Sequence, residues 1–173
     1  MKKILIILSI VILTLTLTKK ENVIIPQNSI RFRVIANSNS EQDQLVKKQL
    51  VNNLSKEINR INQYSKDISS SRKIIQSNLH NFDKIITDSI KNEYYKDNYN
   101  ISYGINHFPD KEYKGVIYEE GDYESLVITL GDGLGDNFWC VLFPPLCLLE
   151  AEETEKDEVE YTSFIKEIID KYF

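Results

Sequence analysis

Cysteine and histidine are scarce in this sequence, which has two of each among its 173 residues. A structural zinc site needs about four such ligands at short spacings. Cys140 and Cys147, with His80 and His107 scattered elsewhere, do not supply them. The sequence therefore predicts no metal site and no cofactor. Carboxylates are abundant instead, at 26, so no spacing singles out the acid pair that glycosidases or aspartic proteases require.

An excess of positive charge is also absent. A formal net charge of -5 argues against a protein that binds a phosphate backbone, because such a protein would show a basic face. We therefore expect no nucleic-acid partner. Arg31 and Arg33 stand close together in "IRFRVIAN", but so short a pair is typical of a solvated strand face or of ion-pair donors.

One long uncharged stretch is present, at residues 4–18, between the lysine pairs Lys2–Lys3 and Lys19–Lys20. It is shorter than the run of about 20 residues that spans a membrane, and it matches the apolar region of an export signal. No small-residue cleavage box follows it. We interpret residues 1–20 as an export signal or as an uncleaved N-terminal anchor, with the rest of the protein exported.

Apolar periodicity predicts an α+β fold. Ile30, Phe32 and Val34 alternate with polar residues, as in a half-buried strand, and later residues form two helical stripes. We expect a small, mainly antiparallel sheet packed against two long amphipathic helices, plus a C-terminal helix. Strands are expected at residues 29–35, 99–105, 114–118 and 125–131, and the two long helices at 40–62 and 72–94.

The expected core draws on both kinds of element. The first long helix begins near Ser38 or Ser40, because each is followed three residues later by an acid, Glu41 or Asp43, that completes a helix-start pattern. Eight residues of the strands and helices should be buried: Phe32, Val34, Leu50, Leu54, Phe82, Ile86, Ile128 and Leu130.

The expected domain organisation follows from composition. Residues 29–149 form the α+β domain. Residues 150–160 carry seven carboxylates against one lysine, so they read as a solvated acidic linker. Residues 161–173 form a C-terminal helix with one apolar face, which either docks on the domain or awaits a partner.

Glycine is rare, and three of the six glycines fall in "GDGLGD" at residues 131–136. The segment follows a strand as a phosphate loop would, but it has no lysine and runs into "NFWC" rather than into a helix. Its aspartates would repel phosphate. We interpret Gly131, Gly133 and Gly135 as hinges that permit positive φ in a loop.

The segment that follows, "NFWCVLFPPLC" at residues 137–147, holds the one tryptophan and both cysteines. Cys140 as a nucleophile would require a histidine base within hydrogen-bond reach, for which His107 is the candidate. An even cysteine count in an exported chain instead favours a Cys140–Cys147 disulfide across Pro144 and Pro145. The alternative is that both thiols are reduced and buried as small apolar residues.

With the disulfide formed, the segment is expected to be a closed hydrophobic loop. An outward-facing loop would present its apolar side chains to a partner. An inward-facing loop would place them in the core, and the interface would lie elsewhere. The candidate partner-binding residues are Trp139, Phe138, Phe143 and Leu146.

Two long stretches resemble the stage II sporulation protein R family. They are "IRFRVIANSNSEQDQLVKKQL" at residues 30–50 and "FPDKEYKGVIYEEGDYESLVITLGDGLGDNFWCVLFPPLC" at residues 108–147. The motifs recur in order and at the right separations. Departures from the family pattern occur at Lys114, Asp132 and Phe138, where the family has Gly, Glu and Trp.

The resemblance implies a signalling protein of endospore formation. Such a protein is made in the forespore, exported into the space between the forespore and mother-cell membranes, and activates a membrane-embedded aspartic protease of the mother cell. That protease then processes a sigma factor precursor. The resemblance therefore implies that the chain is not itself an enzyme and has no small-molecule substrate. The alternative from the residues is an exported Cys/His hydrolase acting on envelope material, with Cys140 and His107.

Overall fold

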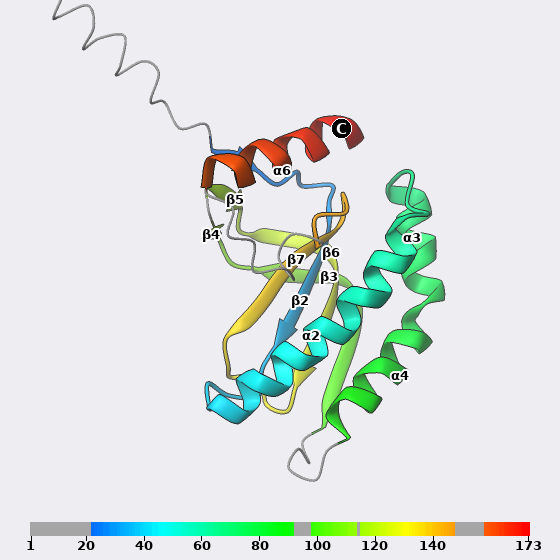
Figure 1. Ribbon diagram of the computed structural model, residues 1–173, viewed down its shortest axis with the longest axis vertical. Coiled ribbons are helices and arrows are strands. Elements are labelled where there is room, and N and C mark those ends of the chain that lie inside the picture. Colours follow the sequence, from blue (N-terminus) through cyan, green and yellow to red (C-terminus); the bar gives the residue numbers. More distant parts are fainter. Residues whose placement is uncertain (1–21, 92–97, 114, 148–157) are drawn as a thin grey trace, which may run out of the picture.

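The computed structural model describes residues 22–91, 98–113, 115–147 and 158–173. Its main feature is a four-stranded mixed sheet with helices packed on one face (Figure 1). This is the expected α+β architecture. In chain order the elements are β1 (Val23–Ile24), β2 (Ile30–Ile35), α2 (Glu41–Asn62), α3 (Ile68–Ser77), α4 (Leu79–Ile90), β3 (Tyr99–Phe108), β4 (Lys111–Tyr113), β5 (Val116–Tyr118), β6 (Gly121–Leu130), β7 (Asn137–Phe143) and α6 (Glu158–Tyr172).

The main sheet has the strand order β3-β6-β2-β7. β2 lies parallel to β6 and antiparallel to β7, and β3 is antiparallel to β6. Two of the three pairings are therefore antiparallel, as expected for a mainly antiparallel sheet. Side chains alternate across a strand, so on β2 Phe32 and Val34 face the helices while Arg31 and Arg33 face the other way.

The first long helix agrees with its expected bounds, and the second does not. The Ser40 side chain accepts a hydrogen bond from the Asp43 backbone N–H at 3.2 Å, so the later of the two expected starts is used. The second helix begins earlier, behind the capping residue Asp67, and breaks at Asn78 into α3 and α4. The Asn78 amide donates to the Ile74 carbonyl at 2.8 Å, which closes the end of α3. Residues 92–94 of the expected helix lie outside the described residues.

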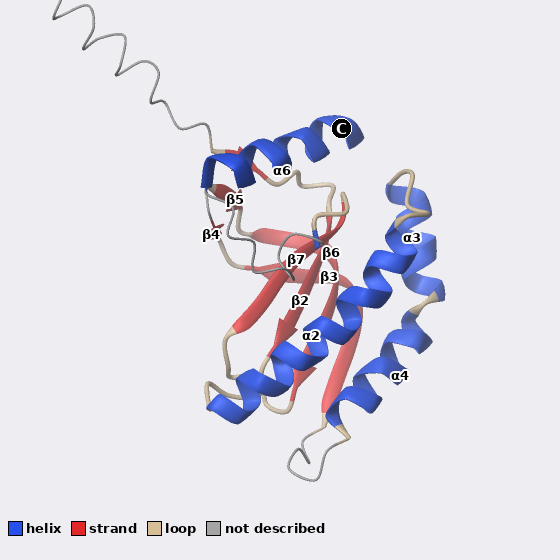
Figure 2. Ribbon diagram, viewed as in Figure 1, coloured by secondary structure: helices blue, strands red, loops and turns tan. Residues whose placement is uncertain are grey.

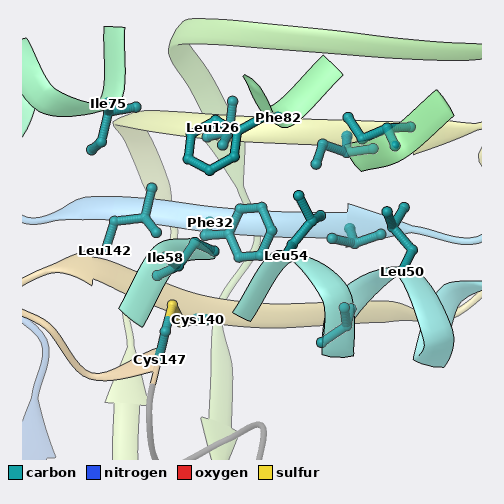
Figure 3. Close-up of a cluster of buried hydrophobic side chains, with 14 of the residues drawn as sticks. Phe32, Leu50, Leu54, Ile58, Ile75, Phe82, Leu126, Cys140, Leu142 and Cys147 are labelled. Atoms are coloured by element: carbon teal, nitrogen blue, oxygen red, sulfur yellow. A yellow bond between two sulfur atoms is a disulfide. The ribbon is translucent and has the colours of Figure 1, made fainter. Parts of the chain in front are cut away.

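The core between the helices and the sheet confirms the expected burial. Figure 3 shows side chains of both layers converging, with Phe32 near the middle. The predicted core residues are all fully buried, namely Phe32, Val34, Leu50, Leu54, Phe82, Ile86, Ile128 and Leu130. The apolar stripes of α2, α3 and α4 are therefore the faces that pack on the sheet.

A second, three-stranded sheet has the order β1-β5-β4 and was not expected. The strand expected at residues 114–118 belongs to this sheet, as β5, rather than to the main one. α6 docks here through Tyr161 and Ile165, which pack with Val23 and Val116. Figure 2 shows α6 over these short strands and away from α2.

Two expected segments lie largely outside the described residues, namely the export signal or anchor at 1–20 and the acidic linker up to residue 157. α6 starts at Glu158, slightly before the expected C-terminal helix. Across the stretches that the structure describes, no helix is both long enough and apolar enough to cross a membrane.

Candidate functional site

Two loops at one end of the main sheet hold each other through side-chain amides. The Asn37 Oδ1 atom accepts from the Asp132 backbone N–H at 2.9 Å, and the Asn39 Oδ1 atom accepts from the Asp136 backbone N–H at 2.6 Å. The first loop leads from β2 into α2, and the second leads from β6 into β7. The "ANSNS" and glycine-rich segments are thus one unit that fixes where α2 and β7 begin.

The glycines of this unit serve both conformation and close approach. Gly131 and Gly133 have φ of 52° and 66°, as expected for hinge glycines. Gly135 has a different reason: a Cβ atom there would collide with the carbonyl of Ser38. This glycine-rich loop therefore packs against the chain's own backbone.

Cys140 and Cys147 form a disulfide, with their Cα atoms 5.2 Å apart. The chain turns at Pro144 and Pro145, and both sulfur atoms are buried in the main core. The expectation of a closed loop is wrong in one respect, because residues 137–143 are strand β7 of the main sheet. The disulfide therefore ties the middle of an edge strand to the turn that follows it.

The aromatic residues of this segment face inward. Trp139 is 8% exposed, and Phe143 and Leu146 are more deeply buried. Phe138 is partly exposed and packs edge-on against Phe32, with ring centroids 6.2 Å apart. These side chains offer little surface to a partner. This is the inward-facing case considered above, and a role of these residues in partner binding stays a prediction.

β7 is apolar on both faces because two different layers cover it. Cys140 and Leu142 belong to the core under the helices. Val141 and Leu146 belong to the cluster under α6 and the small sheet. A strand buried on both sides reads as a continuous apolar run rather than as an alternation, which explains why the sequence pattern did not predict a strand here.

Arg31 lies in an aromatic cage and is not on a solvated face. Its side chain is 1% exposed, and its Cζ atom lies 3.3 Å from the centre of the Tyr123 ring, with Phe108 and Tyr118 also nearby. Burial lowers the pKa of Arg31. Its Nη1 atom donates to the Glu119 carbonyl at 3.2 Å. The expectation of solvation is wrong here, because ring faces replace water around the cation.

Arg33 is paired with Trp139 across β2 and β7. Its Cζ atom lies 5.2 Å from the indole centre, and the Nζ atom of Lys111 lies 5.3 Å from the same ring. A hollow of about 160 Å³ beside this ring is smaller than the 300 to 1,000 Å³ typical of small-molecule sites. Its lining residues are Lys111, Tyr113, Tyr118, Asn137, Phe138 and Trp139.

The structure does not assemble the thiol and histidine that a Cys/His hydrolase needs. Cys140 is bonded to its partner cysteine, and its row across the sheet continues through Phe32 and Leu126 to Tyr103. Three strand spacings separate the ends of that row, on the order of 14 Å. His107 lies four residues further along β3 from Tyr103, and the other histidine, on α4, is exposed. Within the described residues, no group of three or more potential metal ligands gathers.

Polar groups gather instead beside β3. Arg72 of α3 donates two hydrogen bonds to the Glu124 carboxylate, at 2.8 and 2.6 Å. The Tyr103 hydroxyl donates to the same carboxylate at 2.6 Å. The bonds from Arg72 lower the pKa of Glu124. Further along, a ring nitrogen of His107 lies 3.1 Å from the carboxylate of Asp122.

The fold and site define a disulfide-containing α+β domain without an assembled thiol nucleophile. The family described as stage II sporulation protein R matches residues 26–153. Stage II sporulation protein R of Bacillus subtilis (strain 168) is 39% identical over 145 residues. That match covers 81% of this chain and 63% of that protein, so the chain spans under two thirds of the relative's length. The chain belongs to the stage II sporulation protein R family, whose name places it in sporulation. No solved structure matches it significantly.

Proposed function

We propose that this chain is an exported signalling protein of endospore formation that activates a membrane-embedded aspartic protease. It acts in the space between the forespore and mother-cell membranes, either released or tethered by an uncleaved N-terminal segment. The activated protease processes a sigma factor precursor in the mother cell. The chain acts by contact and not as an enzyme.

The disulfide carries this proposal. It joins the only two cysteines of the chain, so no thiol is left to act as a nucleophile. Structural disulfides persist in oxidising compartments outside the cytoplasm, which fits the uncharged stretch at residues 4–18. The distance along the sheet from Cys140 to His107 also disfavours the hydrolase alternative.

Co-expression in a host that lacks the rest of the pathway tests the proposal. The full chain, the protease and the precursor are produced together, and precursor cleavage is measured with and without the chain. Cleavage that depends on the chain is expected. Equal cleavage without it, or a requirement for a further forespore component, would contradict direct activation.

A double variant, His80→Ala with His107→Ala, separates contact from hydrolysis. Both histidines are exposed, so the variant should fold and activate normally. Loss of cleavage in a variant that still melts like the unmodified chain and still binds the protease would favour the hydrolase instead.

A further inference from the structure

β3 is an edge strand whose outer side carries no partner within the described residues. Its ten residues, Tyr99 to Phe108, pair with Leu130 to Gly121 of β6 without a break in register. In an antiparallel ladder only about half of a strand's backbone groups bond to its neighbour. The remaining N–H and C=O groups of β3 therefore point away from the sheet. One side chain, Asn106, reaches one of the strand's carbonyls, that of Gly104.

This edge lacks the devices that usually prevent strand addition. Natural edge strands are interrupted by charged residues, proline or a β-bulge, or are covered by other elements. β3 reads "YNISYGINHF", with no Lys, Arg, Asp, Glu or Pro, and its register has no bulge. The opposite edge strand, β7, is also uncharged, but five of its seven residues are buried.

One side chain near the middle of β3, that of Ile105, is open to solvent, and its neighbours Tyr103 and Gly104 are half-buried. Ile105 is 71% exposed, although it lies on an apolar strand. A Cβ atom built on Gly104 would meet nothing within 4 Å, so the face opposite the helices is clear at that point. An incoming strand would lie beside Ile105 at the edge and would cover part of its exposed side chain.

The end of the strand near His107 is acidic. Asp122 and Glu120 approach the His107 ring at 3.1 and 3.5 Å and are themselves exposed, and exposed Asp110 lies two residues after the end of β3. A strand that binds along this edge with a Lys or Arg at this end would gain charge complementarity. A second copy of β3 cannot supply that cation, because its strand contains no Lys or Arg.

We propose that β3 is the docking edge for the partner protease: an extended segment of its exported part adds to the sheet as a fifth strand. That segment has alternating apolar residues to cover Ile105 and a basic residue beside Asp122. Main-chain hydrogen bonds supply affinity, and alternate side chains supply specificity. This inference rests on the proposed function and specifies its contact surface.

Amide exchange of the full chain, with and without the purified protease in detergent, tests the geometry directly. Strand addition should protect every second amide of β3, because alternate N–H groups point outward. The intervening amides already bond to β6 and should change little. Protection elsewhere with none on β3 would overturn the inference, and so would protection of β3 by a second copy of the chain alone.

A matched pair of variants measures the contribution of the edge. Ile105→Lys places a charge on the edge, and Leu134→Lys changes an equally exposed leucine, 79% exposed, in the loop before β7. Protease binding should weaken on the order of tenfold for Ile105→Lys and within about twofold for Leu134→Lys. Equal effects from the two variants would overturn the inference.

The charge requirement is tested separately. Asp122→Lys should weaken binding several-fold in low salt, whereas Asp132→Lys, on the far loop, should not.

Two measurements, precursor cleavage and amide protection of β3, distinguish failure of the proposed function from failure of the docking edge. Absent cleavage with the unmodified chain rejects activation. Cleavage without alternate-amide protection of β3 rejects only the docking edge, and absent protection rejects that edge in either case.

Discussion

The two edge strands of the main sheet differ in accessibility, and the strand with the more unusual sequence is the less accessible one. β7 contains the unusual residues of the chain, including its tryptophan and a cysteine, yet it is buried on both faces. β3 has an ordinary sequence of tyrosine, isoleucine and asparagine, yet it leaves its outer side and Ile105 open. A conspicuous cluster of aromatic residues thus stabilises the fold here, and the accessible edge is marked by the absence of charge.

Truncating one side chain on each edge strand should give the largest difference in unfolding free energy between the two. Trp139→Ala should lower the free energy of unfolding by about 3 to 5 kcal/mol, because it empties a buried site and removes the ring that Arg33 and Phe108 contact. Ile105→Ala should change it by less than about 0.5 kcal/mol. Urea unfolding measures both. Similar losses for the two variants would contradict the contrast between a buried and an open edge.

Removal of the disulfide should have the next largest effect. The double variant Cys140→Ala and Cys147→Ala should lose about 2 to 3 kcal/mol of unfolding free energy, since a short closed loop constrains the unfolded chain. The intact protein, purified without reductant, should be two mass units lighter than its dithiol form, which mass spectrometry under non-reducing conditions checks. An unchanged melting temperature would mean that packing alone holds β7.

Replacing one glycine on or near each edge strand by alanine compares how closely the backbone is packed at the two places. Gly135→Ala, in the loop before β7, should cost about 1 to 3 kcal/mol, because the new methyl group meets the Ser38 carbonyl. Gly104→Ala on β3 should be neutral or stabilising by up to about 1 kcal/mol, because alanine restricts the unfolded chain. Thermal unfolding of the two variants measures the difference. A loss at Gly104 would show that the open edge is more constrained than its surroundings indicate.

Much of the fold was predictable because it depends on local periodicity. The stripe of α2 and the alternation of β2 each select one buried face, and the eight expected core residues are buried there. Strand order was not predictable. β2 lies between two strands that come some ninety or more residues later in the chain, and such pairing leaves no local pattern. The break at Asn78 was missed because the apolar stripe continues across it.

The candidate site was predictable only in its covalent part. Two cysteines separated by a proline turn favour a disulfide whatever surrounds them, if the chain is exported as proposed. Trp139 faces inward because Phe108 of β3 and Tyr123 of β6 cover it, and Phe143 packs against Tyr172 of α6. These contacts join segments far apart in the chain, so no local pattern reveals them. The cage around Arg31 likewise requires Phe108, Tyr118 and Tyr123 to meet from separate strands.

The smallest expected effect is a pH dependence of stability beside the β3 edge. Bonds from Arg72 lower the folded-state pKa of Glu124, next to Ile105 in the ladder. Stability from this pair is therefore full above the unfolded-state pKa of about 4.3 and is lost as pH falls through the folded-state pKa. Because Arg72 is partly in water, the loss between about pH 6 and pH 3 should be under about 1 kcal/mol. Glu124→Gln should abolish that part of the pH dependence, and the exposed carboxylate variant Glu112→Gln on β4 is the control. Urea unfolding at the two pH values measures this dependence. If the unfolding free energy of Glu124→Gln falls with pH as much as that of the unmodified chain, this ion pair contributes nothing to holding β3 in place.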